Sequence, residues 1–398
     1  MGRQTLYIDI AIIGGGIAGL WTLNQLRSRG YSAVLFEQAA LGSYRTIGSQ
    51  GMIHGGVKYA LAGSWSSGSR AVAAMPGTWR KCLAGKGEVD LRGCKVLSED
   101  FFLFSNGDLQ SRLSSFFASK LLRGHIRKVA PPDYPVPLQS SRFRGQVYRL
   151  ADLVIDVPSL LATLAKQHRD AIFSIDWQRA SLHREAGRAE LALPECNVVP
   201  ERLLLTAGAG NEALMAELGS TLPSMQRRPL QQVLVRHEYQ QPFYGHCLGT
   251  SASPRLTISS HRDQAGRPVW YLGGELATGA GEEEPGQLIN RAQSELTGLL
   301  PWIDFGTTEW ATVQLERAEP LQSTTLRPDQ AFVGRVEGIE NALVAWPTKL
   351  TLTPDLANAV ERELRQENVS PRHPQQLSVL ENLARPPVAT AYWDSLLP

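Results

Sequence analysis

The chain of 398 residues is long enough for a large core and for two domains, and its 43% hydrophobic and 20% charged residues are ordinary for a globular protein. A formal net charge of +2 gives no preference for nucleic acid. The four cysteines, Cys82, Cys94, Cys196 and Cys247, form no C-x-x-C pair and no zinc spacing, so we expect neither a metal site nor a disulfide framework. This cysteine usage suits a reducing cytoplasm, and no apolar run is long enough to span a bilayer.

The first predicted element is an apolar strand, 8–13, that leads directly into the pattern G-x-G-x-x-G at Gly14, Gly16 and Gly19. In this pattern Gly14 permits a tight turn, Gly16 lets the backbone approach a pyrophosphate, and Gly19 lets the next helix pack close to the strand. The N-terminus of that helix attracts phosphate through its free N–H groups. The sequence therefore predicts a dinucleotide-binding site.

The next elements complete a βαβ unit. We predict a helix over 17–29, with Gly30 as its C-terminal cap, and a second buried strand over 32–36 that ends at Glu37. An acidic residue about twenty positions after the glycines binds the ribose 2′-OH. Because Glu37 would repel a 2′-phosphate, we expect FAD or NAD at this site and not NADP.

The middle of the chain alternates between sheet-forming and helical segments. The Gly- and Ser-rich stretch 41–68 suits backbone that passes close to a ligand. Asp156 is predicted to cap a helix that begins near Pro158, and 116–129 is predicted as a basic helical stretch. Further predicted strands cover 101–104, 146–157, 202–210, 233–238, 255–261, 269–275 and 311–317, and a helix covers 285–300.

Two later segments favour FAD over NAD. Leu203–Gly210, a hydrophobic strand followed by small residues, resembles the second flavin-domain motif of FAD oxidoreductases. Farther along, Thr353 is predicted as the N-cap and Pro354 as the first residue of a helix. The positive end of that helix, with Lys349 beside it, would stabilise negative charge on the reduced flavin at N1–C2=O.

The segment 46–59, with the sequence TIGSQGMIHGGVKY, carries a family resemblance. It resembles the Ser-rich, Ile-His-Gly-Gly segment of the D-amino-acid oxidase-like FAD superfamily, which includes glycine oxidase, sarcosine oxidase, 2-hydroxyglutarate oxidase and glycerol-3-phosphate dehydrogenase. The segment 326–334 resembles the G-x-R-P…G segment of the amine oxidases, although Thr325 stands where many members have Gly. The resemblance covers nearly the whole chain.

The resemblance implies an α/β fold, in which a Rossmann-like FAD-binding domain is interrupted by a discontinuous antiparallel-sheet substrate domain. We expect the FAD-binding domain over 1–90, 145–225 and 325–398, and the substrate domain over 91–144 and 226–324.

The resemblance also implies roles for single residues. Arg327 would anchor a substrate carboxylate through its guanidinium fork, and the alternative is a structural ion pair to Glu316 or Glu319. His54 would be the general base for an alcohol, would only shape the pocket for an amine, or would be attached covalently to the flavin. The expected catalytic residues are His54, Arg327 and Lys349, and the substrate pocket adds Gln232, Tyr244, His261 and Tyr271. The expected FAD-binding residues are Gly14, Gly16, Ile17, Ala18, Gly19, Glu37, Gln38, Thr46, Ser49, Gln50, Gly51, His54, Ala207, Gly208, Lys349, Leu350 and Thr351.

Together these features predict an FAD-dependent oxidoreductase that oxidises a small carboxylate-bearing amine or amino acid by hydride transfer to flavin N5. Oxygen or a quinone would then reoxidise the flavin. One alternative is a dehydrogenase for a 2-hydroxy acid or glycerol 3-phosphate, and another is an FAD-binding partner or sensor without turnover. We expect a cytoplasmic protein, and Phe116 and Phe117 in the basic stretch would allow peripheral contact with an anionic membrane.

Overall fold

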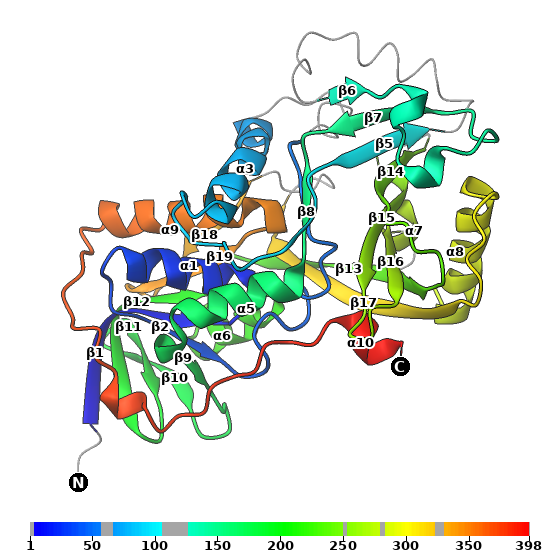
Figure 1. Ribbon diagram of the computed structural model, residues 1–398. Helices are drawn as coiled ribbons and strands as arrows, with labels where there is room; N and C mark the ends of the chain where they lie inside the picture. The colour runs from blue at the N-terminus through cyan, green and yellow to red at the C-terminus, as the bar shows by residue number, and fades with distance from the viewer. Residues whose placement is uncertain are drawn as a thin grey trace.

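The computed structural model describes residues 4–56, 67–105, 126–249, 253–278, 283–322 and 330–397. Within these residues the chain forms two eight-stranded sheets and one three-stranded sheet, with helices packed around them (Figure 1). The predicted α/β class is confirmed. No helix among the described residues is both long and apolar enough to cross a membrane.

The first sheet has the strand order β10-β11-β12-β1-β2-β9, and β19 pairs with both β12 and β18. Its central pairs, β1 with β2 and β12, are parallel. Residues 8–13 of β1 are buried, as expected for a central strand of a parallel sheet. The strands are β1 (Gln4–Ile13), β2 (Ala33–Glu37), β9 (Ile172–Ser174), β10 (Ser181–Glu185), β11 (Arg188–Ala192), β12 (Cys196–Leu205), β18 (Phe332–Arg335) and β19 (Ala342–Trp346).

Helices pack against this sheet where the sequence predicts them. Helix α1 (Ile17–Ser28) lies on β1 and β2 and contacts α5 (Val157–Gln167) and α9 (Thr353–Gln366) (Figure 1). The predicted cap of α5 is confirmed, because the Asp156 carboxylate accepts a hydrogen bond from Ser159 N at 2.9 Å. The short helix α6 (Asn211–Glu217) follows β12.

The predicted N-cap of α9 is wrong. Thr353 has helical backbone angles, with φ −59° and ψ −43°, and its hydroxyl donates to the carbonyl of Leu350 at 2.8 Å. The 3₁₀ turn η7 (Leu350–Leu352) precedes it, so the chain already follows a helical path before Thr353. Pro354 still lies in the first turn, where its missing N–H costs nothing.

The second sheet has the order β17-β13-β16-β15-β14-β5-β7-β6. Among its described strand pairs, β5 with β14 is parallel and the others are antiparallel. Helices α7 (Glu275–Thr278) and α8 (Pro285–Leu299) pack beside it (Figure 1). Its strands are β5 (Phe101–Ser105), β6 (Ile126–Lys128), β7 (Gln146–Leu150), β13 (Met225–Arg236), β14 (Tyr244–Leu248), β15 (Pro254–Arg262), β16 (Pro268–Gly273) and β17 (Glu309–Pro320).

The predicted basic helix over 116–129 is wrong at its end. Residues 126–128 form β6, which pairs antiparallel with β7, because an edge strand of the sheet offers free backbone groups there. The rest of that stretch, including Phe116 and Phe117, lies outside the described residues.

A small sheet lies between the two large ones (Figure 1). Its strands are β3 (Met52–Ile53), β8 (Leu153–Ile155) and β4 (Val96–Ser98), and α3 (Ser67–Leu83) contacts β3. The domain boundaries stay a prediction. Since β7 belongs to the second sheet, we propose that the substrate domain extends to Leu150 and not to 144.

The C-terminal segment connects both large sheets. Leu41, beyond β2, donates its N–H to the carbonyl of Pro387 at 2.7 Å. Farther along, Trp393 in α10 (Tyr392–Leu396) stacks on His261 of β15, with 4.4 Å between ring centroids. The C-terminal tail therefore spans from the first sheet to the second (Figure 1).

Candidate active site

The glycine turn after β1 has the geometry of a cofactor cradle. Gly14 has φ +111°, and a Cβ there would lie 2.7 Å from the Ala207 backbone. A Cβ on Gly19 would lie 2.0 Å from the Gly14 carbonyl oxygen. Gly16 differs from both, because its Cβ would meet only the Thr46 hydroxyl, at 3.4 Å. The space beside Gly16 is therefore open, which would let a pyrophosphate approach the backbone.

Polar groups surround this turn. Glu37 accepts hydrogen bonds from Gly15 N at 2.6 Å and Ala39 N at 2.8 Å, which fixes its carboxylate at the end of β2. Thr46 accepts from Ile17 N at 3.1 Å at the start of α1, and Ala18 follows in the same turn. A fixed acid beside a helix N-terminus fits the ribose and phosphates of FAD. Gln38 follows Glu37 directly.

The end of β12 contacts this turn, and the end of β19 contacts the segment that follows β12. The Thr206 hydroxyl donates to the Gly14 carbonyl at 2.9 Å, and Gly208, with φ +61°, has open space where its Cβ would lie. Trp346, at the end of β19, donates its indole N–H to the Gly208 carbonyl at 3.0 Å. The predicted motif around Ala207 and Gly208 thus lies at the carboxyl edge of the parallel strands, where such folds bind ligands.

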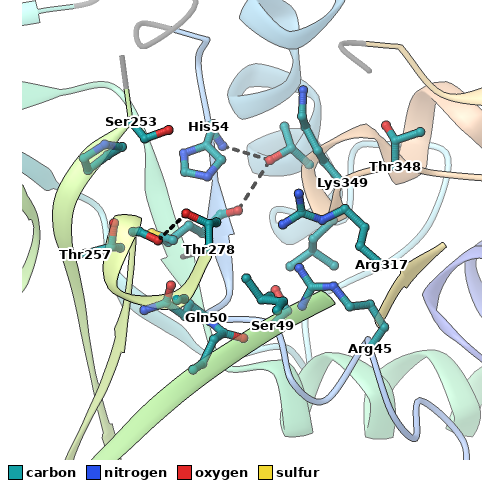
Figure 2. A pocket seen from close by; sticks show the side chains of 18 of the residues that line it. Arg45, Ser49, Gln50, His54, Ser253, Thr257, Thr278, Arg317, Thr348 and Lys349 are labelled. Carbon is teal, nitrogen blue, oxygen red and sulfur yellow. Dashed lines mark hydrogen bonds between the residues drawn. The ribbon is translucent and has the colours of Figure 1, made fainter. Parts of the chain in front are cut away.

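A cavity of about 150 Å³ opens between these loops and the second sheet (Figure 2). It brings together seven of the residues predicted for the site: Ser49, Gln50, His54, Gln232, Lys349, Leu350 and Thr351. It also contains residues that the sequence reasoning missed, among them Arg45, Arg317, Glu319, His246 and Thr278. Gly51 lies between the lining residues Gln50 and Met52, and its φ of +73° suits only glycine well.

One wall of the cavity is a face of the β13–β17 pair. Arg317 and Glu319 are two residues apart on β17 and therefore point to the same side. Glu319 is fully buried and accepts hydrogen bonds from Gln226 at 2.8 Å and from Arg228. Arg317 and Glu319 continue the face of β17 that begins with the buried residues Val313 and Leu315. This change from apolar to charged residues on one face is the signal that could have identified the wall from the sequence.

His54 is held from three sides. Its backbone N–H donates to the Thr351 hydroxyl at 3.0 Å, and its ring Nδ1 lies 3.3 Å from the Asp152 carboxylate. His246 stacks on the ring with 5.9 Å between centroids and 21° between planes. The predicted base thus has a fixed orientation at the cavity, and Asp152 is a partner that the sequence reasoning did not identify.

Three residues predicted for the substrate pocket are not brought to the cavity. Tyr271 is buried behind it, where its hydroxyl contacts the Gly48 carbonyl and Gln232, and burial raises its pKa. His261 packs on Trp393, and burial lowers its pKa to about 3. Burial raises the pKa of Tyr244 to about 12. Alternating side chains of β14, β15 and β16 face opposite sides, so strand membership alone could not place them.

Arg327, the predicted carboxylate anchor, lies outside the described residues, and its role stays a prediction. Within the described part of the chain no group of three or more His, Cys, Asp and Glu residues could hold a metal ion. All four cysteines are buried free thiols. Burial raises the pKa of Cys94 and of Cys247 to about 12, which keeps both protonated.

Comparison with known proteins identifies the family. Residues 9–325 match the DAO family of FAD dependent oxidoreductases. A probable FAD-dependent oxidoreductase of Pseudomonas aeruginosa is 45% identical over 394 residues, which is 98% of each chain. The crystal structure of an FAD dependent oxidoreductase from the same species has a TM-score of 0.86 at 40% identity and covers 100% of both chains.

More distant structures share the fold. Iminodiacetate oxidase from Chelativorans sp. has a TM-score of 0.67 at 15% identity, covering 96% of this chain and 100% of its own. Glycine oxidase from Geobacillus kaustophilus has a TM-score of 0.66 at 16% identity, covering 92% and 99%. The fold, the cradle at Gly14–Gly19 and these matches together show that the chain belongs to the DAO family of FAD-dependent oxidoreductases and is an FAD-dependent enzyme.

Proposed function

We propose that this enzyme oxidises a small carboxylate-bearing amine or amino acid at the carbon next to the carboxylate. The observation that carries the proposal is the charge of the cavity. Arg45, Arg317 and Lys349 line it, whereas Glu319 is the one carboxylate among its described lining residues. Glu319 is already paired with Arg228. The wall therefore favours an anionic substrate.

The cations have distinct tasks in this proposal. A guanidinium binds a planar carboxylate through two parallel hydrogen bonds, so Arg45, Arg317 and the predicted anchor Arg327 are the candidates for holding the substrate. Lys349 precedes η7 and would support negative charge on the reduced flavin ring. Bound FAD supplies the acceptor for the hydride, and oxygen or a quinone would then take the electrons.

A 2-hydroxy acid is the second candidate, and the position of His54 favours it. Its ring lines the cavity beside the cations. An alcohol must lose its hydroxyl proton during oxidation, and histidine is the usual base for that step. A neutral amine needs no such base, whereas an amine that binds as ammonium must first lose a proton.

Anaerobic mixing of the holoenzyme with a panel of amino acids, N-methyl amino acids, 2-hydroxy acids and glycerol 3-phosphate tests both candidates. We expect one class of carboxylate-bearing compound to remove the visible absorbance of the oxidised flavin. If no compound in the panel reduces the flavin, the proposed substrate class is wrong.

Variants then test the anion site. Arg317→Ala and Arg327→Ala should each raise KM by about 10-fold or more, since losing a charge-assisted pair costs about 1.5–3 kcal/mol. FAD should stay bound in both. The matched control is Arg92→Ala, which removes an exposed arginine whose ion pair, with Asp90, lies at the surface. Unchanged KM in both site variants would contradict the anion site.

A further inference from the structure

We propose that Asp152 is a positioning residue that makes His54 the proton acceptor of the cavity. The inference rests on the proposed function, because it needs a substrate that carries a proton on nitrogen or oxygen. It adds to that function that one ring nitrogen of His54 accepts the substrate proton, and that Asp152 determines which ring nitrogen carries the hydrogen.

The Asp152 carboxylate cannot turn away from His54 without losing a second contact. One oxygen, Oδ2, lies 3.3 Å from His54 Nδ1, and the other, Oδ1, accepts a hydrogen bond from Gly55 N at 2.6 Å. The side chain is only 4% exposed, so water does not replace either partner. A buried carboxylate needs such contacts, because an unpaired buried charge is costly.

The ring of His54 is also fixed on its other sides. Its backbone is held by Thr351 at 3.0 Å, in the turn that precedes α9. Its face stacks on His246, whose own Nδ1 lies 2.8 Å from the Thr257 hydroxyl and whose ring packs on Phe101 at 4.5 Å between centroids. These contacts come from different elements, so the orientation of His54 is determined by the fold.

A carboxylate beside Nδ1 favours the tautomer in which Nδ1 carries the hydrogen. The lone pair is then on Nε2, on the opposite side of the ring from Asp152. His54 lines the cavity, and in this proposal Nε2 is the nitrogen that meets the bound substrate. The same pairing of an acid with a base histidine orients the ring and stabilises its protonated form in other enzyme classes.

The step balances with groups already assigned. The proton on the substrate nitrogen or oxygen moves to Nε2, and the C–H bond breaks with its electron pair leaving as hydride to FAD, the oxidant of this family. A C=N or C=O double bond forms, and His54 becomes an imidazolium paired with Asp152.

The other charged groups at the cavity make this pairing necessary. Arg45, Arg317 and Lys349 oppose a new positive charge, while Glu319 is paired with Arg228, and His246 adds a second titratable ring. Among the described residues, Asp152 is therefore the carboxylate that contacts His54 and can offset the positive charge that His54 gains.

The first test measures flavin reduction in Asp152→Asn holoenzyme against pH by anaerobic stopped flow, with the compound from the panel that reduces the wild type fastest. We expect the limiting reduction rate to fall by about 10- to 100-fold, as for lost orienting partners of histidine, with little change in the substrate dissociation constant. Asp152→Glu should recover part of the rate. The control, Asp133→Asn at an exposed position, should match the wild type.

A second test needs no substrate. Nitrogen-15 NMR of the histidine rings in oxidised holoenzyme, with His54 assigned through His54→Gln, reports the tautomer directly. We expect the Nδ1–H form in the wild type, and a mixture of tautomers with titration at lower pH in Asp152→Asn. This test separates the inference from the proposed function. If the tautomer is as expected but no compound in the panel reduces the flavin, only the proposed function is wrong.

Three results would overturn the inference. One is an unchanged reduction rate in Asp152→Asn, and another is a wild-type His54 that carries its hydrogen on Nε2. The third is a yellow pellet after acid precipitation that turns colourless in His54→Gln, because His54 would then be bonded to the flavin and could not accept a proton.

Discussion

Gln50 and Tyr271 bind each other's segments: Gln50 Nε2 donates to the Tyr271 carbonyl at 2.6 Å, and the Tyr271 hydroxyl donates to the Gly48 carbonyl at 3.0 Å. The first residue belongs to the loop that lines the cavity, and the second to β16 of the second sheet. This pair of contacts fixes the loop around Gln50 against the second sheet.

Tyr271→Phe should therefore weaken both folding and cofactor retention. The loss of one buried hydroxyl, which leaves the Gly48 carbonyl without this donor, should lower the free energy of unfolding by about 1–3 kcal/mol. Urea denaturation of the holoenzyme measures this change, and FAD release should also become faster. Tyr239→Phe, in the aromatic cluster around Trp270, should change neither quantity.

Gly19→Ala should abolish FAD binding. The new methyl group would lie 2.0 Å from the Gly14 carbonyl oxygen, a backbone atom that cannot move without opening the turn. Absorbance of the purified protein reports the bound flavin. Gly298→Ala is the matched control, since nothing lies within 4 Å of its Cβ position in α8. It should retain FAD and gain up to about 1 kcal/mol of stability. Full flavin content in Gly19→Ala would contradict the cradle.

Glu37→Ala should lower FAD affinity without unfolding the protein. The carboxylate holds Gly15 N and Ala39 N in place, and we expect it to bind the ribose. We expect an increase of about 10- to 100-fold in the FAD dissociation constant, equivalent to the loss of about 1.5–3 kcal/mol from hydrogen bonds to a charged group. Titration of the apoprotein with FAD, followed by flavin fluorescence, measures it. An exposed acid, Glu99, provides the control as Glu99→Ala. Equal affinities would rule out Glu37 as a cofactor ligand.

Two buried histidines make stability depend on pH. Burial lowers the pKa of His237 from 6.5 to about 4 and that of His261 to about 3. Between about pH 6.5 and 4 the unfolded chain therefore binds protons at both sites that the folded chain does not. Their contribution to the free energy of unfolding falls with decreasing pH, by about 1.4 kcal/mol per pH unit for each histidine.

His237→Phe should remove one of these two contributions, since its ring packs edge-on against Trp270 and Phe305 and a phenyl ring fits the same aromatic site. Urea denaturation at several pH values between 7 and 5 should show a shallower decline than the wild type. His183→Asn, at a half-exposed position, should keep the wild-type slope. An unchanged slope in His237→Phe would mean that His237 is already protonated in the fold.

The sequence predicts the cofactor end of the molecule better than the substrate end. The roles of Gly14 and Glu37 can be predicted because they follow from a local pattern of one strand, one turn and one helix. Arg45 and Arg317 were missed because one lies in the loop after β2 and the other on β17, and only the folded chain brings both to the same cavity. Asp152 shows the same limit, since it reaches His54 only through the pairing of β3 with β8.

The order of strands in the first sheet has a consequence for synthesis of the protein. β1 leaves the ribosome long before its parallel neighbour β12, and β19, which pairs with β12, follows later still. Until then the nascent chain exposes apolar strand edges that it cannot pair with its own residues. We therefore expect the growing polypeptide to depend on chaperones and to complete the first sheet only once β19 has left the ribosome.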